Sequence, residues 1–225
     1  MRSRRTDDIQ AGLRDCAPVL LAVIPFAAVF GTVAVERGMD VVQVLLASAS
    51  IYAGASQFVM IDLLDQQIAP WVIVLTVGAV NFRHVLYSAA IGRRMGAFGR
   101  SRELLAFFFL TDPQFAAAER RASVHGLRPA YWFAFAGLLY ASWMVGNLVG
   151  VLFGTLIEDQ RSWGLDMVLP IYFLALVVSF RATSGFAGIL AVSAVVTIAT
   201  VALVGAPWHI LAGGAAGMAF AALRA

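Results

Sequence analysis

The sequence predicts an all-α fold, a polytopic transmembrane helical bundle with about six to eight membrane segments. Apolar residues make up 61% of the 225 positions and charged residues only 13%, and the mean hydropathy is +0.84. All sixteen basic residues are arginines, and most of them lie in the short links between apolar stretches. Basic links are typical of loops on the cytoplasmic side, so we expect a multi-pass chain with a cytoplasmic N-terminus.

Eight apolar segments follow one another along the chain, and residues 1–225 are expected to form a single transmembrane domain. Residues 1–15 are expected to be a cytoplasmic N-terminal segment rather than part of a cleaved signal, because the apolar stretch that follows has about twenty residues. In chain order, the segments are residues 16–35, 41–64, 69–91, 104–118, 130–156, 167–180, 186–205 and 209–223.

The distribution of arginine indicates that two segments do not simply cross the membrane. If every segment crossed, the N-terminus and the link after the third segment would face opposite sides, although both are rich in arginine. We therefore expect an interrupted or re-entrant helix near residues 50–58, where small and hydroxyl residues surround Gly54. A second interruption is expected near residues 108–114, because that short segment contains Asp112 and Pro113 between arginine-rich flanks.

The third apolar segment carries polar residues near mid-membrane. Asn81, Arg83 and His84 lie in a stretch long enough, at about 1.5 Å per residue, to cross a hydrocarbon core of about 30 Å. An arginine at that depth costs roughly 2.5–3.5 kcal/mol on insertion scales and normally faces protein or a watery cavity with a partner. We expect Arg83 to face the inside of the bundle, where Asp112 or Asp62 could pair with it.

Several motifs resemble those of the AzlC family, whose members are the large subunits of branched-chain amino acid exporters of the AzlCD, BrnFE and YgaZH type. The motifs are Pro25 followed by Phe30-Gly31, the string Ala53-Gly-Ala-Ser-Gln-Phe58, the string Asn81-Phe-Arg-His84 with Leu86-Tyr87-Ser88, and Thr111-Asp112. The resemblance implies a transporter in the bacterial inner membrane that exports valine, leucine, isoleucine and in some members methionine. It also implies a secondary, proton-coupled mechanism and a small AzlD-type membrane subunit as partner.

One position departs from the family's pattern. The motifs cover about residues 10–125, and the rest of the chain agrees with the family in length and hydropathy. The family usually continues Thr-Asp with glutamate, whereas this chain has Pro113. If that glutamate contributes to proton coupling or substrate choice, this chain differs from its relatives in that respect.

Four residues of the first interruption are candidates for binding the substrate. An exporter of zwitterionic amino acids must hold a carboxylate and an ammonium group away from bulk water. In transporters with broken helices, the N–H groups at the start of a half-helix bind the carboxylate and free carbonyls bind the ammonium. The candidates for such a break are Gly54, Ala55, Ser56 and Gln57. The alternative is a face of small residues for close helix packing.

Three further polar residues are candidates for the same substrate site, and each has a structural alternative. Arg83 could bind the substrate carboxylate or form a structural ion pair. Asn81 could hydrogen-bond to the substrate or link two helices. Asn147 lies in a row of glycines at every fourth position, beside Gly146. It could complete the site from the second half of the chain or join two helices.

Asp112 and His84 are the candidates for proton coupling. Desolvation in an apolar segment favours the protonated form of a carboxyl group, so Asp112 could carry a proton. The alternative is that Asp112 caps a half-helix at the membrane surface. Histidine side chains titrate near neutrality, which suits His84 for proton coupling, and the alternative is a neutral, hydrogen-bonded histidine.

Other functional classes have less support in the sequence. A passive channel or an assembly subunit of a membrane complex would keep the same topology without a coupled cycle. An intramembrane serine hydrolase would use Ser56, His84 and Asp112, but the glycine-serine-glycine elbow of hydrolases is absent, so no enzymatic activity is expected. Nucleic-acid binding, a metal site and a cofactor are not expected either, because there is no basic stripe and the three histidines are scattered.

Overall fold

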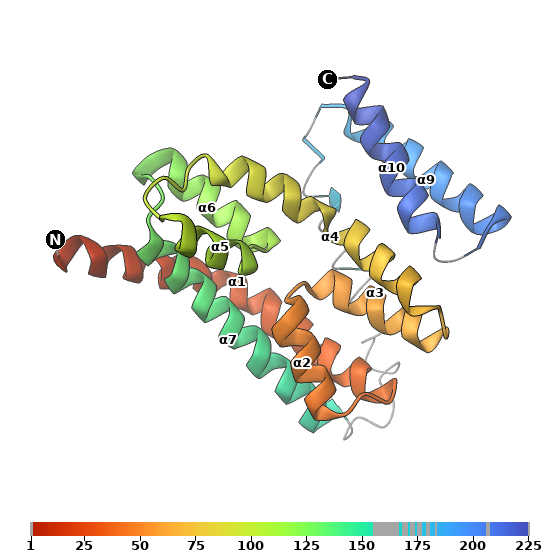
Figure 1. Ribbon diagram of the computed structural model, residues 1–225, viewed down its shortest axis with the longest axis horizontal. Helices are drawn as coiled ribbons and strands as arrows, with labels where there is room; N and C mark the ends of the chain where they lie inside the picture. The colour runs from red at the N-terminus through yellow and green to blue at the C-terminus, as the bar shows by residue number, and fades with distance from the viewer. Residues whose placement is uncertain are drawn as a thin grey trace. The chain divides into compact units, whose positions relative to one another are not determined.

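The computed structural model describes residues 2–154, 184–205 and 208–224, together with isolated positions between 167 and 182 (Figure 1). Every regular element in these ranges is helical. Four helices of the described part are long and apolar enough to cross a membrane: Arg5–Glu36, Pro70–Gly92, Pro129–Phe153 and Phe186–Leu203. The prediction of an all-α, polytopic membrane protein is confirmed.

The chain forms two compact units. The first unit comprises Met1–Phe58 and Asn81–Glu158, and the second comprises Val59–Val80 and Asp159–Ala225. All the candidate substrate-binding and proton-coupling residues belong to the first unit.

Two long helices form the frame of the first unit. Figure 1 shows α1 (Arg2–Glu36) and α7 (Pro129–Gly154) side by side. With 35 residues, α1 is about 50 Å long, which exceeds a hydrocarbon core of about 30 Å. Residues 1–15, expected to precede the first span, therefore continue it as helix from Arg2 onward.

Close contacts between small residues hold α1 and α7 together. Gly12 packs on the backbone of Tyr131 near the start of both helices. Further along, Thr32 donates its hydroxyl to the carbonyl of Gly150 at 3.0 Å, and a Cβ atom at Gly150 would overlap the carbonyl oxygen of Ala28. The two helices therefore run in the same direction, and the glycine row predicted on α7 serves their close packing.

The first predicted interruption is present, but it lies just before the residues expected to form it. Helix α2 (Val41–Ile51) ends at Tyr52, whose φ of 39° is left-handed, and α3 (Gly54–Asp65) follows. Residues 54–57, expected to supply the break, form the first turn of α3 instead. The reason is that Tyr52 takes the left-handed conformation, whereas Gly54 is needed for a close packing contact described below.

The second predicted interruption is also present. Helix α5 (Arg100–Phe108) and helix α6 (Asp112–His125) are separated by a short turn that ends in extended backbone at Thr111, with φ of −127° and ψ of 170°. Pro113 falls in the first turn of α6, where the N–H that proline lacks would have no acceptor within the helix. The helix is therefore broken at this turn rather than continuing as one span.

An apolar core attaches α5 and α6 to the end of α4 (Pro70–Gly92) and to α7. Ile91, Met95, Ala106 and Trp132 are buried in this core. Burial of large side chains of this kind stabilises the fold through close packing. The core fixes the start of α6 beside the second half of α4, where the polar candidate residues lie.

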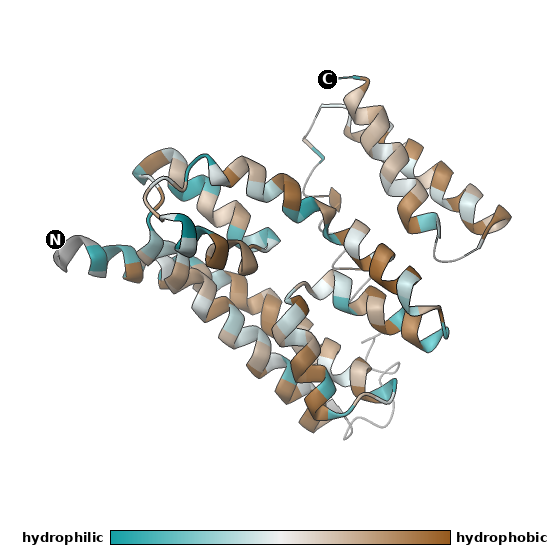
Figure 2. Ribbon diagram, in the orientation of Figure 1, coloured by the Kyte–Doolittle hydropathy of each residue, from teal (hydrophilic) through white to brown (hydrophobic). Residues whose placement is uncertain are grey.

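The second unit contains, in its described part, the apolar helices α9 (Phe186–Leu203) and α10 (Trp208–Ala222), and Figure 2 shows how apolar both are. A Cβ atom at Gly213 would overlap the hydroxyl of Thr197 on α9, so the glycines of α10 permit the close crossing that their spacing predicts. The apolar segment expected at residues 167–180 falls, apart from isolated positions, outside the described residues.

Replacing Gly150 with alanine is expected to destabilise the protein, because the added Cβ would overlap the carbonyl of Ala28. Overpacking of this kind costs about 1–3 kcal/mol and should lower the melting temperature of the purified protein in detergent. Gly137→Ala on the same helix is the matched control, since no described neighbour lies within 4 Å of its added Cβ and alanine favours the helix. Equal stability of the two variants would contradict the close packing of α1 and α7.

Candidate functional site

One side-chain hydrogen bond joins the first interruption to the middle of α4, and a second one crosses the interruption itself. Ser56, in the first turn of α3, donates its hydroxyl to Oδ1 of Asn81 at 2.7 Å. Gln57 donates from Nε2 to Oγ of Ser48 across the interruption at 2.9 Å. Ser48, Ser56 and Gln57 are completely buried. Two candidate residues that lie 25 positions apart in the sequence, Ser56 and Asn81, therefore meet inside the first unit.

The first backbone N–H groups of α3 have no hydrogen-bond acceptor within the helix. The N–H of Gln57 donates to the carbonyl of Ala53 at 3.0 Å. The N–H groups of Gly54, Ala55 and Ser56 come before this bond, where a helix has no carbonyl to offer them and carries the positive end of its dipole. A carboxylate is the kind of ligand that such a terminus favours.

Aromatic rings pack around the start of α3. A Cβ atom at Gly54 would come within 2.8 Å of both Phe26 and Trp143, so a larger residue there would have to displace these rings. Phe58 lies 5.1 Å from Phe26 and 5.5 Å from Phe30, measured between ring centroids. The half-helix therefore begins against an apolar wall contributed by α1 and α7, and the expected packing role applies to Gly54.

Two buried amide oxygens near these rings have no hydrogen-bond partner among the described residues. They are Oε1 of Gln57 and Oδ1 of Asn147. Asn147 lies one turn after Trp143 on α7 and donates from Nδ2 to the carbonyl of that residue at 2.7 Å. No hydrogen bond in the described part of the chain joins Asn147 to Asn81 or Arg83. Because an unpartnered buried acceptor costs about 1–3 kcal/mol, both oxygens are suited to accept hydrogen bonds from a ligand.

Tyr52 connects the two helix interruptions. Its ring lies 6.4 Å from Phe108 and 6.2 Å from Phe109, measured between centroids, and α5 ends at these two phenylalanines. The ring of Tyr140 on α7 packs edge-to-face on Tyr52 at 4.8 Å. The end of α2 and the end of α5 are therefore in direct contact through aromatic packing.

Arg83 of α4 pairs with Asp112 of α6. Nη1 of Arg83 lies 3.1 Å from Oδ2 of Asp112, and the side chains are only 23% and 20% exposed. Tyr87, one turn further along α4, donates its hydroxyl to Oδ1 of the same carboxylate at 2.9 Å. Of the two partners expected for Arg83, the structure shows Asp112, whereas Asp62 accepts a hydrogen bond at 2.9 Å from Gln66 in the turn after α3.

His84 lies between the two groups of polar contacts. Its Nδ1 is 3.1 Å from the carbonyl oxygen of Asn81, and its ring packs edge-to-face on Tyr87 at a centroid distance of 5.9 Å. Contacts therefore lead from Ser56 through Asn81, His84 and Tyr87 to Asp112. This row, which we call the polar row of α4, brings together four of the nine candidate residues, and a fifth, Arg83, joins it through its ion pair with Asp112. The sequence motifs contain all the residues of this row, but they did not indicate the hydrogen bond between Tyr87 and Asp112.

A model of the AzlC protein family matches residues 18–157, which include every candidate site residue. The chain belongs to the AzlC family. The inner membrane protein YgaZ of Escherichia coli (strain K12) is 31% identical over 221 residues, which cover 95% of this chain and 89% of YgaZ. The family expected from the motifs is confirmed.

Two other relatives of this AzlC-family chain cover less of it. An uncharacterized membrane protein of Archaeoglobus fulgidus is 35% identical over 154 residues, 66% of this chain and 64% of that protein. The branched-chain amino acid transport protein AzlC of Bacillus subtilis (strain 168) is 23% identical over 161 residues, 71% of this chain and 62% of that protein. No solved structure shows a significant match. The chain is therefore a membrane protein related to a named transport protein.

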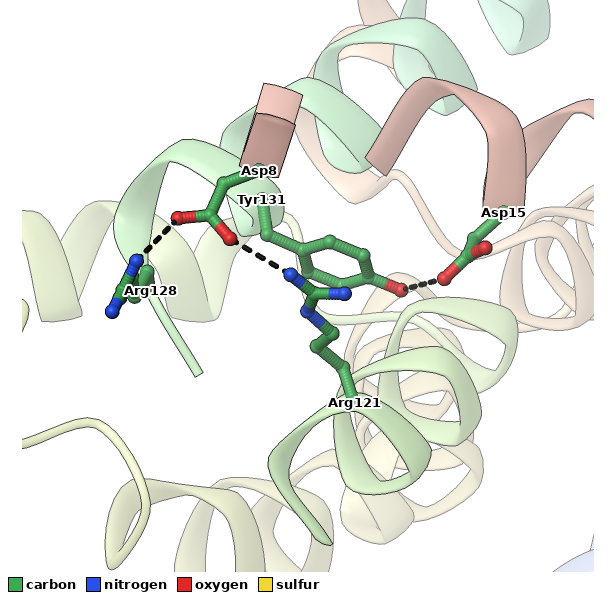
Figure 3. A network of polar contacts seen from close by, with 5 residues as sticks. All are labelled: Asp8, Asp15, Arg121, Arg128 and Tyr131. Atoms are coloured by element: carbon green, nitrogen blue, oxygen red, sulfur yellow. Dashed lines mark hydrogen bonds and ion pairs between the residues drawn. The ribbon is translucent and has the colours of Figure 1, made fainter. Parts of the chain in front are cut away.

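A second polar network, shown in Figure 3, joins Asp8 and Asp15, which precede the AzlC-family match, to three residues inside it, and it was missed from the sequence. Asp8 accepts hydrogen bonds from Arg121 at 2.8 Å and from Arg128 at 3.2 Å. Tyr131 donates to Asp15 at 2.8 Å, and the guanidinium of Arg121 lies over the Tyr131 ring at 5.0 Å. The arginines were interpreted as topology signals alone. The signal that could have revealed the network is the seven-residue spacing of Asp8 and Asp15, which places both on one face of a helix.

Ser56, His84 and Asp112 of this AzlC-family chain are not arranged as a catalytic triad. Ser56 directs its hydroxyl to Asn81 rather than to a histidine. Asp112 is held by Arg83 and does not orient His84 through a hydrogen bond. A serine nucleophile needs a base within hydrogen-bond reach, so this geometry gives no support to a hydrolase.

Separate and combined substitution of Arg83→Gln and Asp112→Asn should show that the two residues stabilise the protein as a pair. Each single change leaves a largely buried charge without its partner, so each should lower the melting temperature. The double variant should lose less stability than the sum of the two single losses. The expected coupling free energy is about 0.5–3 kcal/mol.

The ion pair between Arg94 and Glu119 is the matched control for this cycle. Its atoms are 3.8 Å apart and its side chains are more exposed, at 48% and 34%. Exposed pairs contribute little, so its coupling should stay below about 1 kcal/mol. Additive effects at Arg83 and Asp112 would show that their contact is not energetically significant.

Proposed function

We propose that this AzlC-family chain is a subunit of a secondary transporter that exports branched-chain amino acids across the bacterial inner membrane. The observation that carries the proposal is the buried start of α3, where Ser56 binds Asn81 beside an aromatic wall and an unpartnered amide oxygen of Gln57. The name of the Bacillus subtilis relative, a branched-chain amino acid transport protein, supports the substrate class. Valine, leucine and isoleucine are the proposed substrates, and methionine is a further candidate.

The proposed substrate site uses the start of α3 for the charged end of the amino acid. The N–H groups of Gly54, Ala55 and Ser56 bind the carboxylate, as a helix N-terminus favours. The oxygens Oε1 of Gln57 and Oδ1 of Asn147 accept hydrogen bonds from the ammonium group, which relieves their lack of a partner. The branched side chain then packs against the neighbouring aromatic rings, where burial of apolar surface is favourable.

Asp112 is the proposed carrier of the coupling proton. When Asp112 is protonated, it loses its charge and its strong attraction to Arg83. Arg83 is then able to bind the substrate carboxylate through its guanidinium. His84, which lies between Asn81 and Tyr87, connects the substrate region with Asp112 along the polar row of α4. Arg83 therefore has two states, one paired with Asp112 and one released from it. A coupled cycle requires that substrate and proton shift the equilibrium between two such states.

A small AzlD-type membrane subunit is the proposed partner of this chain. In the described part of the second unit, α9 has no buried residue. Apart from the face that packs on α10, its apolar surface is therefore open to lipid or to a neighbouring transmembrane helix. The transport assay below accordingly uses this chain both alone and together with such a subunit.

Counterflow of radiolabelled valine in proteoliposomes tests the proposed function. Vesicles preloaded with unlabelled valine should accumulate the label above its equilibrium level if the protein is a carrier, whereas a passive channel only equilibrates the label. The direction of transport is tested in cells by measuring intracellular valine after a dipeptide load. Absence of counterflow with and without the small subunit would contradict the proposal.

Ser56→Ala should reduce this counterflow by about tenfold, because Asn81 loses its donor and an unsatisfied buried acceptor costs about 1–3 kcal/mol. Ser50→Ala is the matched control: Ser50 is exposed, lies on α2 and bonds only to carbonyls of its own helix at 2.6 and 3.4 Å. Both variants are compared at equal membrane abundance. Full counterflow by Ser56→Ala would remove the hydrogen bond to Asn81 from the proposed site.

Asp112→Asn should abolish export driven by a pH gradient, because asparagine cannot exchange a proton. The same variant should keep measurable counterflow, since asparagine resembles the protonated carboxyl group and exchange needs no net proton movement. Asp62→Asn is the matched control, because Asp62 is exposed and its side chain bonds to Gln66, four residues further along, rather than to a candidate residue. Unchanged pH-driven export by Asp112→Asn would exclude Asp112 as the proton carrier.

A further inference from the structure

An open hollow of about 980 Å³ lies where the N-terminal ends of α1 and α7 meet α5. Arg5 of α1, Arg102 of α5 and Arg128 just before α7 line it, and all three are exposed. The hollow contains none of the residues of the proposed substrate site. We call it the arginine hollow.

The arginine hollow is positively charged, although one aspartate, Asp8, also lines it. Asp8 is buried and already accepts hydrogen bonds from Arg121 at 2.8 Å and Arg128 at 3.2 Å (Figure 3). Arg128 uses only Nη1 for that contact, its side chain stays 47% exposed, and a guanidinium has five N–H donors. Arg5, Arg102 and the remaining donors of Arg128 are therefore available to bind a further anion.

Part of the wall of the arginine hollow is apolar. Ile9 of α1, Leu105 of α5 and Phe133 of α7 line it beside the arginines. Leu105 is 52% exposed and Ile9 is 37% exposed. Apolar side chains beside cationic groups suit a ligand that combines an anionic group with hydrocarbon, whereas a small free anion would leave this wall uncovered.

The position of the arginine hollow along α1 agrees with the surface of a bilayer. The hollow includes Arg5 and Ile9, at the start of a helix of 35 residues. Such a helix is about 50 Å long and extends past a hydrocarbon core of about 30 Å into the headgroup region. Basic pockets between membrane helices at this depth favour anionic lipid headgroups.

We propose that the arginine hollow binds an anionic phospholipid. The phosphate accepts hydrogen bonds from Arg5, Arg102 and Arg128, and an acyl chain lies along Leu105 and Phe133. A zwitterionic lipid is disfavoured, because its ammonium group is repelled by the arginines. The proposal stands independently of the transported substrate, since it concerns a different set of residues.

Native mass spectrometry of the purified, delipidated protein tests the lipid proposal. Phosphatidylglycerol should bind about tenfold more tightly than phosphatidylethanolamine, and Arg5→Gln/Arg102→Gln should remove most of this preference. Arg128 is left unchanged because it also binds Asp8. Arg93→Gln/Arg120→Gln is the matched control, since both residues are exposed and lie outside the hollow; it loses the same charge and should keep the preference.

Three results would overturn the proposal. One is equal binding of the two lipids to the unaltered protein, and another is an equal loss of preference in the control pair. The third is displacement of phosphatidylglycerol by excess inorganic phosphate, which would show a site for free phosphate instead. If the double variant is less stable than the unaltered protein, Arg102→Gln alone is measured, and an unchanged preference in that folded variant also overturns the proposal.

Discussion

The ion pair between Arg83 and Asp112 is the interaction on which the arrangement of the first unit depends. An arginine in the middle of an apolar helix must find a counter-charge inside the protein. Asp112 reaches it only because α5 and α6 are separate helices, so that the start of α6 lies against α4. A continuous helix through residues 104–118 would carry this carboxylate past Arg83. The second interruption therefore supplies the counter-charge that the arginine in the middle of α4 requires.

Both half-helices turn their N-terminal ends towards the same short stretch of α4. The start of α3 contacts it through Ser56 and Asn81, and the start of α6 contacts it through Asp112 and Arg83. Each helix start favours negative charge. At α6 the protein supplies that charge itself, whereas at α3 it supplies a neutral serine. This difference is the physical reason for assigning the proton to one half-helix and the substrate carboxylate to the other.

Much of this arrangement was predictable from the sequence, because apolar length, arginine distribution and polar residues at mid-membrane each carry a large free-energy cost or gain. The break before α3 was predicted in the right region, but its position was not, because left-handed Tyr52 replaces the glycine that local preference favours. The spacing of Asp8 and Asp15 indicates a polar face on α1, but it does not identify Arg121 as the partner of Asp8. That pairing depends on α1 continuing as helix through polar residues and on α7 running beside it in the same direction.

The packing of Tyr52 on Phe108 and Phe109 has a thermodynamic consequence. In the proposed transport cycle, this packing would link the end of α2 to the turn before Asp112, so that substrate binding at the start of α3 and protonation of Asp112 influence each other. Such linkage is reciprocal. Whatever factor an amino acid bound at α3 applies to the affinity of Asp112 for a proton, the proton must apply to the affinity for the amino acid.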